Sequence, residues 1–205
     1  MSTSALDYDL YEDQHYTYAD MLEWDESIRA EIIDGEVYMM SPLARFHQDI
    51  SRELFGPLYN FLKGKPCKVY PAPFGVRLFP KDDLSDDTVV EPDIVVVCDH
   101  SKLDDRGCNG APDLVIEILS PSNTQRDRIV KFRKYLAAGV REYWVVDPGQ
   151  KTVEVHIMNA GDAPLGSHQY ITTVYDAADE APVSVLPGCS IRLKDVFSED
   201  AAEEA

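Results

Sequence analysis

The stretch Gly110-Ala-Pro-Asp-Leu-Val-Ile-Glu-Ile-Leu-Ser-Pro-Ser122 determines how the rest of the chain is organised. Its centre, from Leu114 to Leu119, is an apolar run bounded by prolines, and this pattern predicts a strand. A run that is apolar on both faces is typical of a strand in the middle of a sheet covered on both sides. Glu117 interrupts the run, and a carboxylate there needs a cation, a metal ion or hydrogen-bond donors to compensate for its burial.

An upstream stretch, Glu91-Pro-Asp-Ile-Val-Val-Val-Cys98, repeats the pattern of a Pro-Asp pair that opens a β-branched run. We therefore expect two strands that each carry an acidic residue, Asp93 and Glu117. A helix is predicted next, capped near Asn123 and ended by Gly139. It is basic, because six of the 19 Lys and Arg residues lie between Arg126 and Arg141. Two acidic strands followed by a basic helix predict a divalent-metal site for phosphate chemistry.

The remaining segments predict more strands than helices. Asp34-Gly35 marks a hairpin over residues 30–40, and apolar spacing predicts a helix over 43–62. Further strands are expected at 69–79 (two short ones), 142–147, 151–158, 169–175 and 183–193, whereas 81–88 and 100–110 are expected to be polar loops. A helix between the strands that carry Glu117 and Trp144 favours an α/β fold with a mixed central β-sheet flanked by helices.

The domain organisation is predicted to be simple. Residues 1–16 are acidic and rich in Tyr, and we expect a weakly ordered arm. Residues 17–197 are expected to form a single domain, because the chain of 205 residues contains no internal repeat and no linker. Residues 198–205 are expected to form an acidic tail.

Composition restricts the classes of partner and compartment. With 44% hydrophobic and 27% charged residues, the chain has an ordinary globular composition, and no run approaches the length of a membrane span. The N-terminus shows no secretory signal, and the four cysteines form no CxxC pair, so we expect reduced cysteines and a cytoplasmic protein. The net charge of −18 opposes long-range attraction to nucleic acid, but the basic segment can still form a local positive patch.

Read together, the motifs resemble those of the Uma family of restriction-endonuclease-like proteins, in the PD-(D/E)XK nuclease superfamily. The motifs that carry the resemblance, in chain order, are Glu31-Ile-Ile-Asp-Gly, Met40-Ser-Pro, His47, Glu91-Pro-Asp93, Pro112-Asp-Leu-Val-Ile-Glu-Ile-Leu-Ser-Pro-Ser122, Asp127 with Lys131 and Tyr135, and Gly139-Val-Arg-Glu-Tyr-Trp-Val-Val-Asp-Pro148. The resemblance implies a restriction-endonuclease-like core with an N-terminal hairpin and added C-terminal strands. It also implies hydrolysis of phosphodiester bonds in DNA that depends on Mg²⁺ (or Mn²⁺).

The resemblance gives Asp93 and Glu117 the role of metal ligands, with the main-chain carbonyl of Ile118 as a further ligand. The physical argument agrees, because carboxylates that hold Mg²⁺ stabilise charge at the phosphate and help to activate water. Each residue also has a structural interpretation. Asp93 could be a turn residue at the start of a strand, and Glu117 could belong to a buried ion pair.

The chain departs from the superfamily signature after Glu117. The signature has a Lys two residues later, and Leu119 stands there instead. We expect Lys131, on the following helix, to replace it. Lys131 shares a helix face with Asp127 and Tyr135, nearly opposite the apolar residues, so a solvated face with an Asp–Lys pair is the alternative. Lys134 is a weaker substitute.

Glu31 and His47 are the remaining candidate catalytic residues. Glu31 could supply a third acidic group, although a surface position on its strand is slightly favoured. His47 could act as a base, or it could be a hydrogen-bonded structural residue. Tyr143 and Trp144 are expected in the core, and no glycine-rich phosphate loop and no zinc-ligand spacing occurs in the sequence.

Three functional classes therefore remain open at the level of sequence. The favoured class is a metal-dependent endonuclease acting on DNA, with a homodimer expected because cutting two strands usually needs two active sites. The second is a catalytically impaired protein that keeps the nuclease fold to bind nucleic acid or to regulate. The third is a structural dimerisation module.

Overall fold

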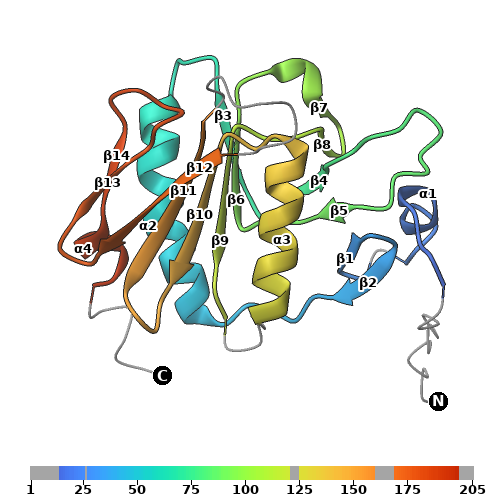
Figure 1. Ribbon diagram of the computed structural model, residues 1–205, viewed down its shortest axis with the longest axis horizontal. Helices are drawn as coiled ribbons and strands as arrows, with labels where there is room; N and C mark the ends of the chain where they lie inside the picture. Colours follow the sequence, from blue (N-terminus) through green and yellow to red (C-terminus); the bar gives the residue numbers. More distant parts are fainter. Residues whose placement is uncertain (1–13, 26, 121–124, 160–168, 199–205) are drawn as a thin grey trace.

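The structure is a computed structural model that describes residues 14–25, 27–120, 125–159 and 169–198 (Figure 1). Within these ranges, the side chains of residues 125–127, 159 and 169 are not described. No helix in the described ranges is long and apolar enough to cross a membrane.

A mixed six-stranded sheet forms the centre of the molecule. Its strand order is β12 (Gln169–Asp176), β11 (Thr152–Asn159), β10 (Glu142–Asp147), β9 (Leu114–Ile118), β6 (Ile94–Val97) and β3 (Lys68–Pro71). β9 and β10 are parallel and are joined through helix α3 (Gln125–Ala138), while the other neighbours are antiparallel. The predicted mixed sheet with flanking helices is confirmed, and the central position of β9 follows from its apolar run.

Each face of β9 packs against a different core. Leu114, Ile116 and Ile118 face a core that includes Ile50 and Leu54 of helix α2 (Arg45–Leu62). Val115, on the other face, belongs to a second core with residues of α3. The two helices cover opposite faces of the sheet (Figure 1). Because side chains alternate along a strand, Glu117 points to the face covered by α3.

A second six-stranded sheet packs beside the first. It has the order β2 (Glu36–Met39), β1 (Ala30–Ile33), β5 (Val89–Val90), β4 (Gly75–Arg77), β8 (Gly107–Asn109) and β7 (Leu103–Asp104). The predicted hairpin is confirmed, since β1 and β2 pair and the turn residues Asp34 and Gly35 have φ of 54° and 80°. These positive φ values are those a type I′ turn requires.

Two segments expected to be polar loops are more structured than predicted. Asp86, in the 81–88 segment, is fully buried and paired with Arg77. The 100–110 segment contains a short 3₁₀ helix, η1 (His100–Lys102), followed by β7 and β8. Both predictions rested on local polarity, which does not reveal polar groups that are paired inside the fold.

The ends of the chain differ in part from the prediction. Residues 1–13 lie outside the described residues, but Tyr16 is buried and its amide donates to the carbonyl of Gly35 over 2.9 Å. Thr17 caps the short helix α1 (Tyr18–Met21). The predicted strand over 183–193 is instead a hairpin of β13 (Glu180–Pro182) and β14 (Ser190–Arg192) followed by helix α4 (Leu193–Val196). The domain limits at 17 and 197 remain a prediction.

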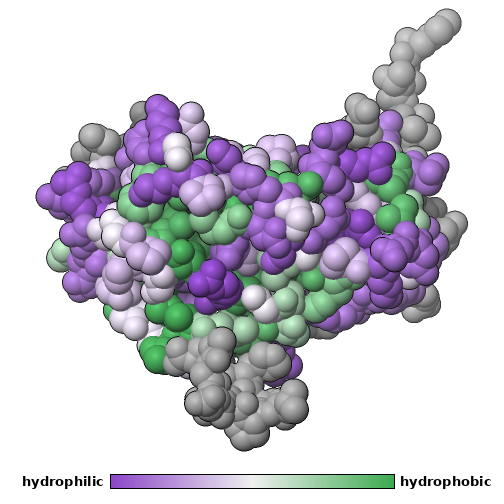
Figure 2. All heavy atoms as spheres, turned by 90° about the horizontal axis from the view of Figure 1, so that it is seen from above, coloured by the Kyte–Doolittle hydropathy of each residue, from purple (hydrophilic) through white to green (hydrophobic). Residues whose placement is uncertain are grey.

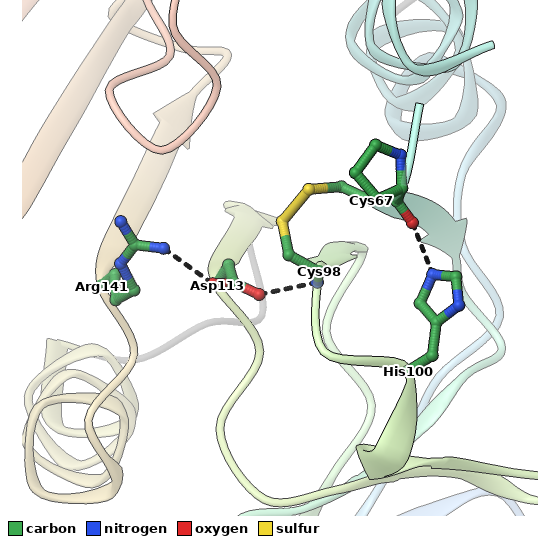
Figure 3. Close-up of a disulfide and its surroundings, with 6 residues drawn as sticks. Cys67, Cys98, His100, Asp113 and Arg141 are labelled. Carbon is green, nitrogen blue, oxygen red and sulfur yellow. Dashed lines mark hydrogen bonds and ion pairs between the residues drawn. A yellow bond between two sulfur atoms is a disulfide. The ribbon is translucent and has the colours of Figure 1, made fainter. Parts of the chain in front are cut away.

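Cys67 and Cys98 form a disulfide, so the expectation that the cysteines are reduced is wrong for this pair (Figure 3). The pairing of Lys68 with Val97 places the two cysteines opposite each other, one step beyond the end of the β3–β6 ladder. Cys108 and Cys189 are free and buried. The 31-residue separation of the bonded pair gives no recognisable spacing, and only the strand register brings them together.

Replacing both Cys67 and Cys98 by Ser should lower the free energy of unfolding by about 2–4 kcal/mol, because the cross-link restricts the unfolded chain. Urea denaturation with and without a thiol reductant measures this. The reductant should destabilise the wild-type protein by the same amount and leave the double variant unchanged. Identical wild-type curves under the two conditions would contradict a stabilising disulfide.

Candidate active site

The candidate site lies where β9 ends and β6 begins. The pairing of Ile94 with Ile116 places Asp93, one residue before β6, opposite Glu117 on β9. Directly opposed residues have neighbouring Cβ atoms, so both carboxylates lie at the same end of the strand pair. A cleft of about 930 Å³ opens here, and its lining includes Glu31, His47, Asp93, Glu117 and Lys131, together with Ile118. The opposite end of the sheet, seen from above in Figure 2, carries hydrophilic and apolar side chains side by side.

Asp93 has a structural contact as well as a place in the cleft. Its Oδ2 accepts a hydrogen bond of 2.7 Å from the amide of Ile118 at the end of β9. Asp113, the other Pro-Asp residue, makes the equivalent contact at the opposite end of the same strand pair, where its Oδ2 accepts from Cys98 over 2.7 Å (Figure 3). The two residues differ in their ionic partners, because Asp113 pairs with Arg141 and Asp93 with His47. The structural interpretation of Asp93 is therefore satisfied, and it does not exclude a second role.

Glu117 is held by two donors from α3. Its Oε1 accepts from the Tyr135 hydroxyl over 2.5 Å and from Lys131 Nζ over 3.1 Å. Burial raises the pKa of Glu117 to about 7, and the negative charges of Asp93 and Glu31 add to the rise, while Lys131 opposes it. Positive charge near this carboxyl group is consequently needed to keep it ionised near neutral pH.

Lys131 and Glu31 do not lie on solvated faces. The Lys131 side chain is 14% exposed, and its Nζ lies 2.8 Å from Glu31 Oε1, whose side chain is 7% exposed. The same Glu31 oxygen accepts from the Glu91 amide over 2.8 Å, so the surface position favoured for Glu31 is wrong. Burial lowers the pKa of Lys131, but the carboxylates of Glu117 and Glu31 raise it by more and keep the ammonium charged.

The helix face that carries Lys131 is turned inward, so the alternative of a solvated face is wrong. Tyr135 is 1% exposed, whereas the apolar Ile129, on a different face, is 46% exposed. The Asp127 side chain, expected on the same face, lies outside the described residues. Lys134 instead pairs with Asp34 in the β1–β2 turn.

His47 reaches the site from the first turn of α2. Its Nε2 lies 3.3 Å from the Ile118 carbonyl oxygen and 3.4 Å from Asp93 Oδ2. The residue is 6% exposed, and its Nδ1 is buried without a hydrogen-bond partner within the described part of the chain. Burial lowers the pKa of His47, but the contacts with Asp93 and Ile118 raise it by more.

Several features of the cleft were not predicted from the sequence. Tyr135 was placed on the Lys131 face without a role, and its spacing of four residues from Lys131 was the available signal. Glu91 and Asp147 also line the cleft. One wall is apolar, with a lining that includes Met39, Met40, Pro42, Leu43 and Phe46. Among the described residues of the lining, Lys131 is the one Lys or Arg, so the positive charge of the site is concentrated at a single point.

The donor groups suit a hard divalent cation in part. The carboxylates of Asp93 and Glu117 and the Ile118 carbonyl are oxygen ligands, the type that Mg²⁺ prefers. Among the described residues, no group of three or more His, Cys, Asp and Glu side chains is placed to hold a metal ion. Mg²⁺ commonly binds through one or two carboxylates and completes its shell with water and substrate phosphate. The residues present therefore fit a Mg²⁺-like ion that keeps water ligands.

Comparisons with known proteins identify the family and the fold. The family described as "Uma2: Putative restriction endonuclease" matches residues 17–194. A protein of Synechocystis sp. (strain ATCC 27184 / PCC 6803 / Kazusa), called "Uncharacterized protein slr1290", is 31% identical over 116 residues, which span 56% of this chain and 58% of that protein. A crystal structure from Anabaena variabilis ATCC 29413, described as a putative nuclease belonging to DUF820, matches with a TM-score of 0.69 and 24% identity over 89% of this chain and 98% of that one. This likeness shows that the two share a fold.

Proposed function

The chain belongs to the Uma2 family of restriction-endonuclease-like proteins, and we propose that it is a divalent-metal-dependent endonuclease that hydrolyses phosphodiester bonds in DNA. One observation carries the proposal. Asp93 and Glu117, from neighbouring strands, line one cleft with Lys131, whose Nζ lies 3.1 Å from Glu117. Paired carboxylates without a cation would repel a phosphate, whereas carboxylates with a cation and a lysine attract it.

Each residue has a distinct task in this proposal. Asp93, Glu117 and the Ile118 carbonyl would hold Mg²⁺ or Mn²⁺, which when bound neutralises phosphate charge and makes a bound water more acidic. Lys131 would place a fixed positive charge beside the phosphate, where negative charge increases in the transition state. Glu31 and Tyr135 would orient Lys131 and Glu117. Glu31 accepts from the Lys131 ammonium, and the Tyr135 hydroxyl donates to Glu117.

The second candidate is a protein that binds nucleic acid without cutting it. The observation that favours it is Leu119, which packs on the apolar core where the superfamily signature has a lysine. The inward position of Lys131 weighs against it, because a cation is supplied to the cleft from α3 instead. DNA as the substrate and a homodimeric assembly belong to the nuclease proposal. The cytoplasmic location remains a prediction from the sequence, and it no longer rests on reduced cysteines, because Cys67 and Cys98 form a disulfide.

The chain contains a matched control for the test of this function. Asp93→Asn should abolish Mg²⁺- or Mn²⁺-dependent cleavage of plasmid DNA, because the amide can still accept from Ile118 but carries no charge for a metal ion. Asp113→Asn changes an equivalent Pro-Asp residue at the other end of the same strands and should cleave like the wild type. Chelation by EDTA should stop cleavage in both active proteins. Cleavage by Asp93→Asn at the wild-type rate would rule out its role as a ligand.

A further inference from the structure

The contacts of His47 bring its ring to two oxygens of the candidate site. Its Nε2 faces two acceptor oxygens, the Ile118 carbonyl at 3.3 Å and Asp93 Oδ2 at 3.4 Å. Hydrogen bonds from nitrogen to oxygen are most often about 2.9–3.0 Å long, so both contacts are long. One N–H group shared between two acceptors at these distances makes two weak hydrogen bonds, so the arrangement also suits a role in which both oxygens and Nε2 face a common partner.

The same distances fit ligands that share an ion. Oxygen ligands of Mg²⁺ lie about 2.1 Å from an octahedral ion, so neighbouring ligands are roughly 3 Å apart. Both oxygens that face Nε2 belong to residues already proposed to bind the cation. We propose that His47 Nε2 is a direct ligand of the cation, together with Asp93 and the Ile118 carbonyl. This inference rests on the proposed function and adds a nitrogen ligand to its site.

The surroundings of His47 fix the position of the ring. Ile50 and Leu54, on the same helix, are fully buried in the core beneath the sheet, so α2 cannot move away without opening that core. Nδ1 has no hydrogen-bond partner in the described part of the protein. Within the described residues, the polar contacts of the imidazole ring are therefore those of Nε2.

A nitrogen ligand has a consequence for metal selectivity. Mg²⁺ prefers shells made of oxygen alone, whereas imidazole is a good ligand for transition metals. The site should consequently bind Mn²⁺ more tightly than Mg²⁺. Glu117, whose Oε1 is engaged by Lys131 and Tyr135, would complete the site through its second oxygen or through a water molecule.

Pulsed electron paramagnetic resonance of bound Mn²⁺ tests the ligand directly, because it detects coupling to a coordinated nitrogen. The wild-type protein should show imidazole coupling, and His47→Gln should lose it and bind Mn²⁺ roughly tenfold or more weakly. His156→Gln is the control, because His156 lies on β11 against Thr172 and Phe132 and outside the residues that line the cleft.

The outcomes separate this inference from the function on which it rests. Mn²⁺ that binds without nitrogen coupling, or coupling that persists in His47→Gln, would overturn the inference and leave the metal-dependent nuclease intact. Wild-type protein that binds no Mn²⁺ would overturn both. If His47→Gln does not fold, histidine labelled with the heavier nitrogen isotope in the wild-type protein gives the same answer, since the coupling pattern must change if histidine is a ligand.

Discussion

Replacing Glu117 by Gln should reduce the rate of metal-dependent cleavage by about a thousandfold or more, the upper range for removing one preorganised electrostatic group. Gln has nearly the same size as Glu and can still accept from Tyr135 and Lys131, so the fold should persist. It lacks the negative charge that would help to hold a divalent cation beside Asp93. Plasmid cleavage measures the reaction rate, and calorimetric titration with Mn²⁺ measures the affinity for the cation. The rate and the affinity should fall together.

A stability measurement on metal-free protein separates lost chemistry from lost folding. Because burial raises the pKa of Glu117 from 4.5 to about 7, the folded protein binds more protons than the unfolded chain between these values. The contribution of this group to the free energy of unfolding therefore falls as the pH rises through that window. Glu117→Gln cannot ionise and should lack this contribution. The free energy of unfolding, measured by urea denaturation, should therefore differ less between pH 5 and pH 8 in the variant than in the wild type. Full cleavage by a folded Glu117→Gln protein would remove Glu117 from the mechanism.

The central strand and its carboxylate could be predicted because their signal is local. The apolar run around Glu117 needs two covered faces wherever it lies, and a carboxylate in it needs compensation. The two Pro-Asp runs likewise predicted two strands that each carry one carboxylate of the site. The two residues nevertheless lie opposite each other only because the register pairs Ile94 with Ile116, and no sequence pattern specifies that register.

The surroundings of the carboxylates could not be predicted because they come from distant segments. Glu31 is buried since the β1–β2 hairpin belongs to a second sheet that packs against α3, and a strand pattern of four residues does not reveal this. The periodicity of α3 could not decide whether Lys131 faces solvent or the site. One side of the helix carries apolar residues, and another side carries an ion-pair network. The contact of His47 with Ile118 spans 71 residues and depends on where α2 begins.

Lys131 provides the second large expected effect. Lys131→Met keeps most of the side-chain volume and removes the charge, so the cleavage rate should fall by about a hundredfold or more if the ammonium stabilises the transition state. Affinity for Mn²⁺ should be unchanged or slightly higher, because a positive charge that competes with the cation for Glu117 is gone. The loss of activity with metal binding retained distinguishes this role from that of a ligand.

The same substitution also leaves Glu31 and Glu117 without their cation, and breaking a buried ion pair in this way costs about 3–5 kcal/mol. Glu31→Gln added to Lys131→Met removes one of the two uncompensated charges and should recover much of this stability. It should not recover cleavage, since no positive charge returns to the cleft. Urea denaturation and the cleavage rate of the double variant therefore separate the contribution of Lys131 to stability from its contribution to catalysis.

Returning a lysine at position 119 is the most direct test of where the charge must be. Leu119 lines the same cleft as Glu117 and Lys131, and it follows Glu117 by two residues, so its side chain leaves the strand on the same side. Leu119→Lys in the Lys131→Ala background should restore part of the activity if both positions reach one phosphate. If a folded double variant shows no rescue, an ammonium at position 119 does not reach the place that Lys131 reaches from α3. Wild-type cleavage by Lys131→Ala alone would show that the reaction needs no cation from the helix, and would exclude the proposed role of Lys131.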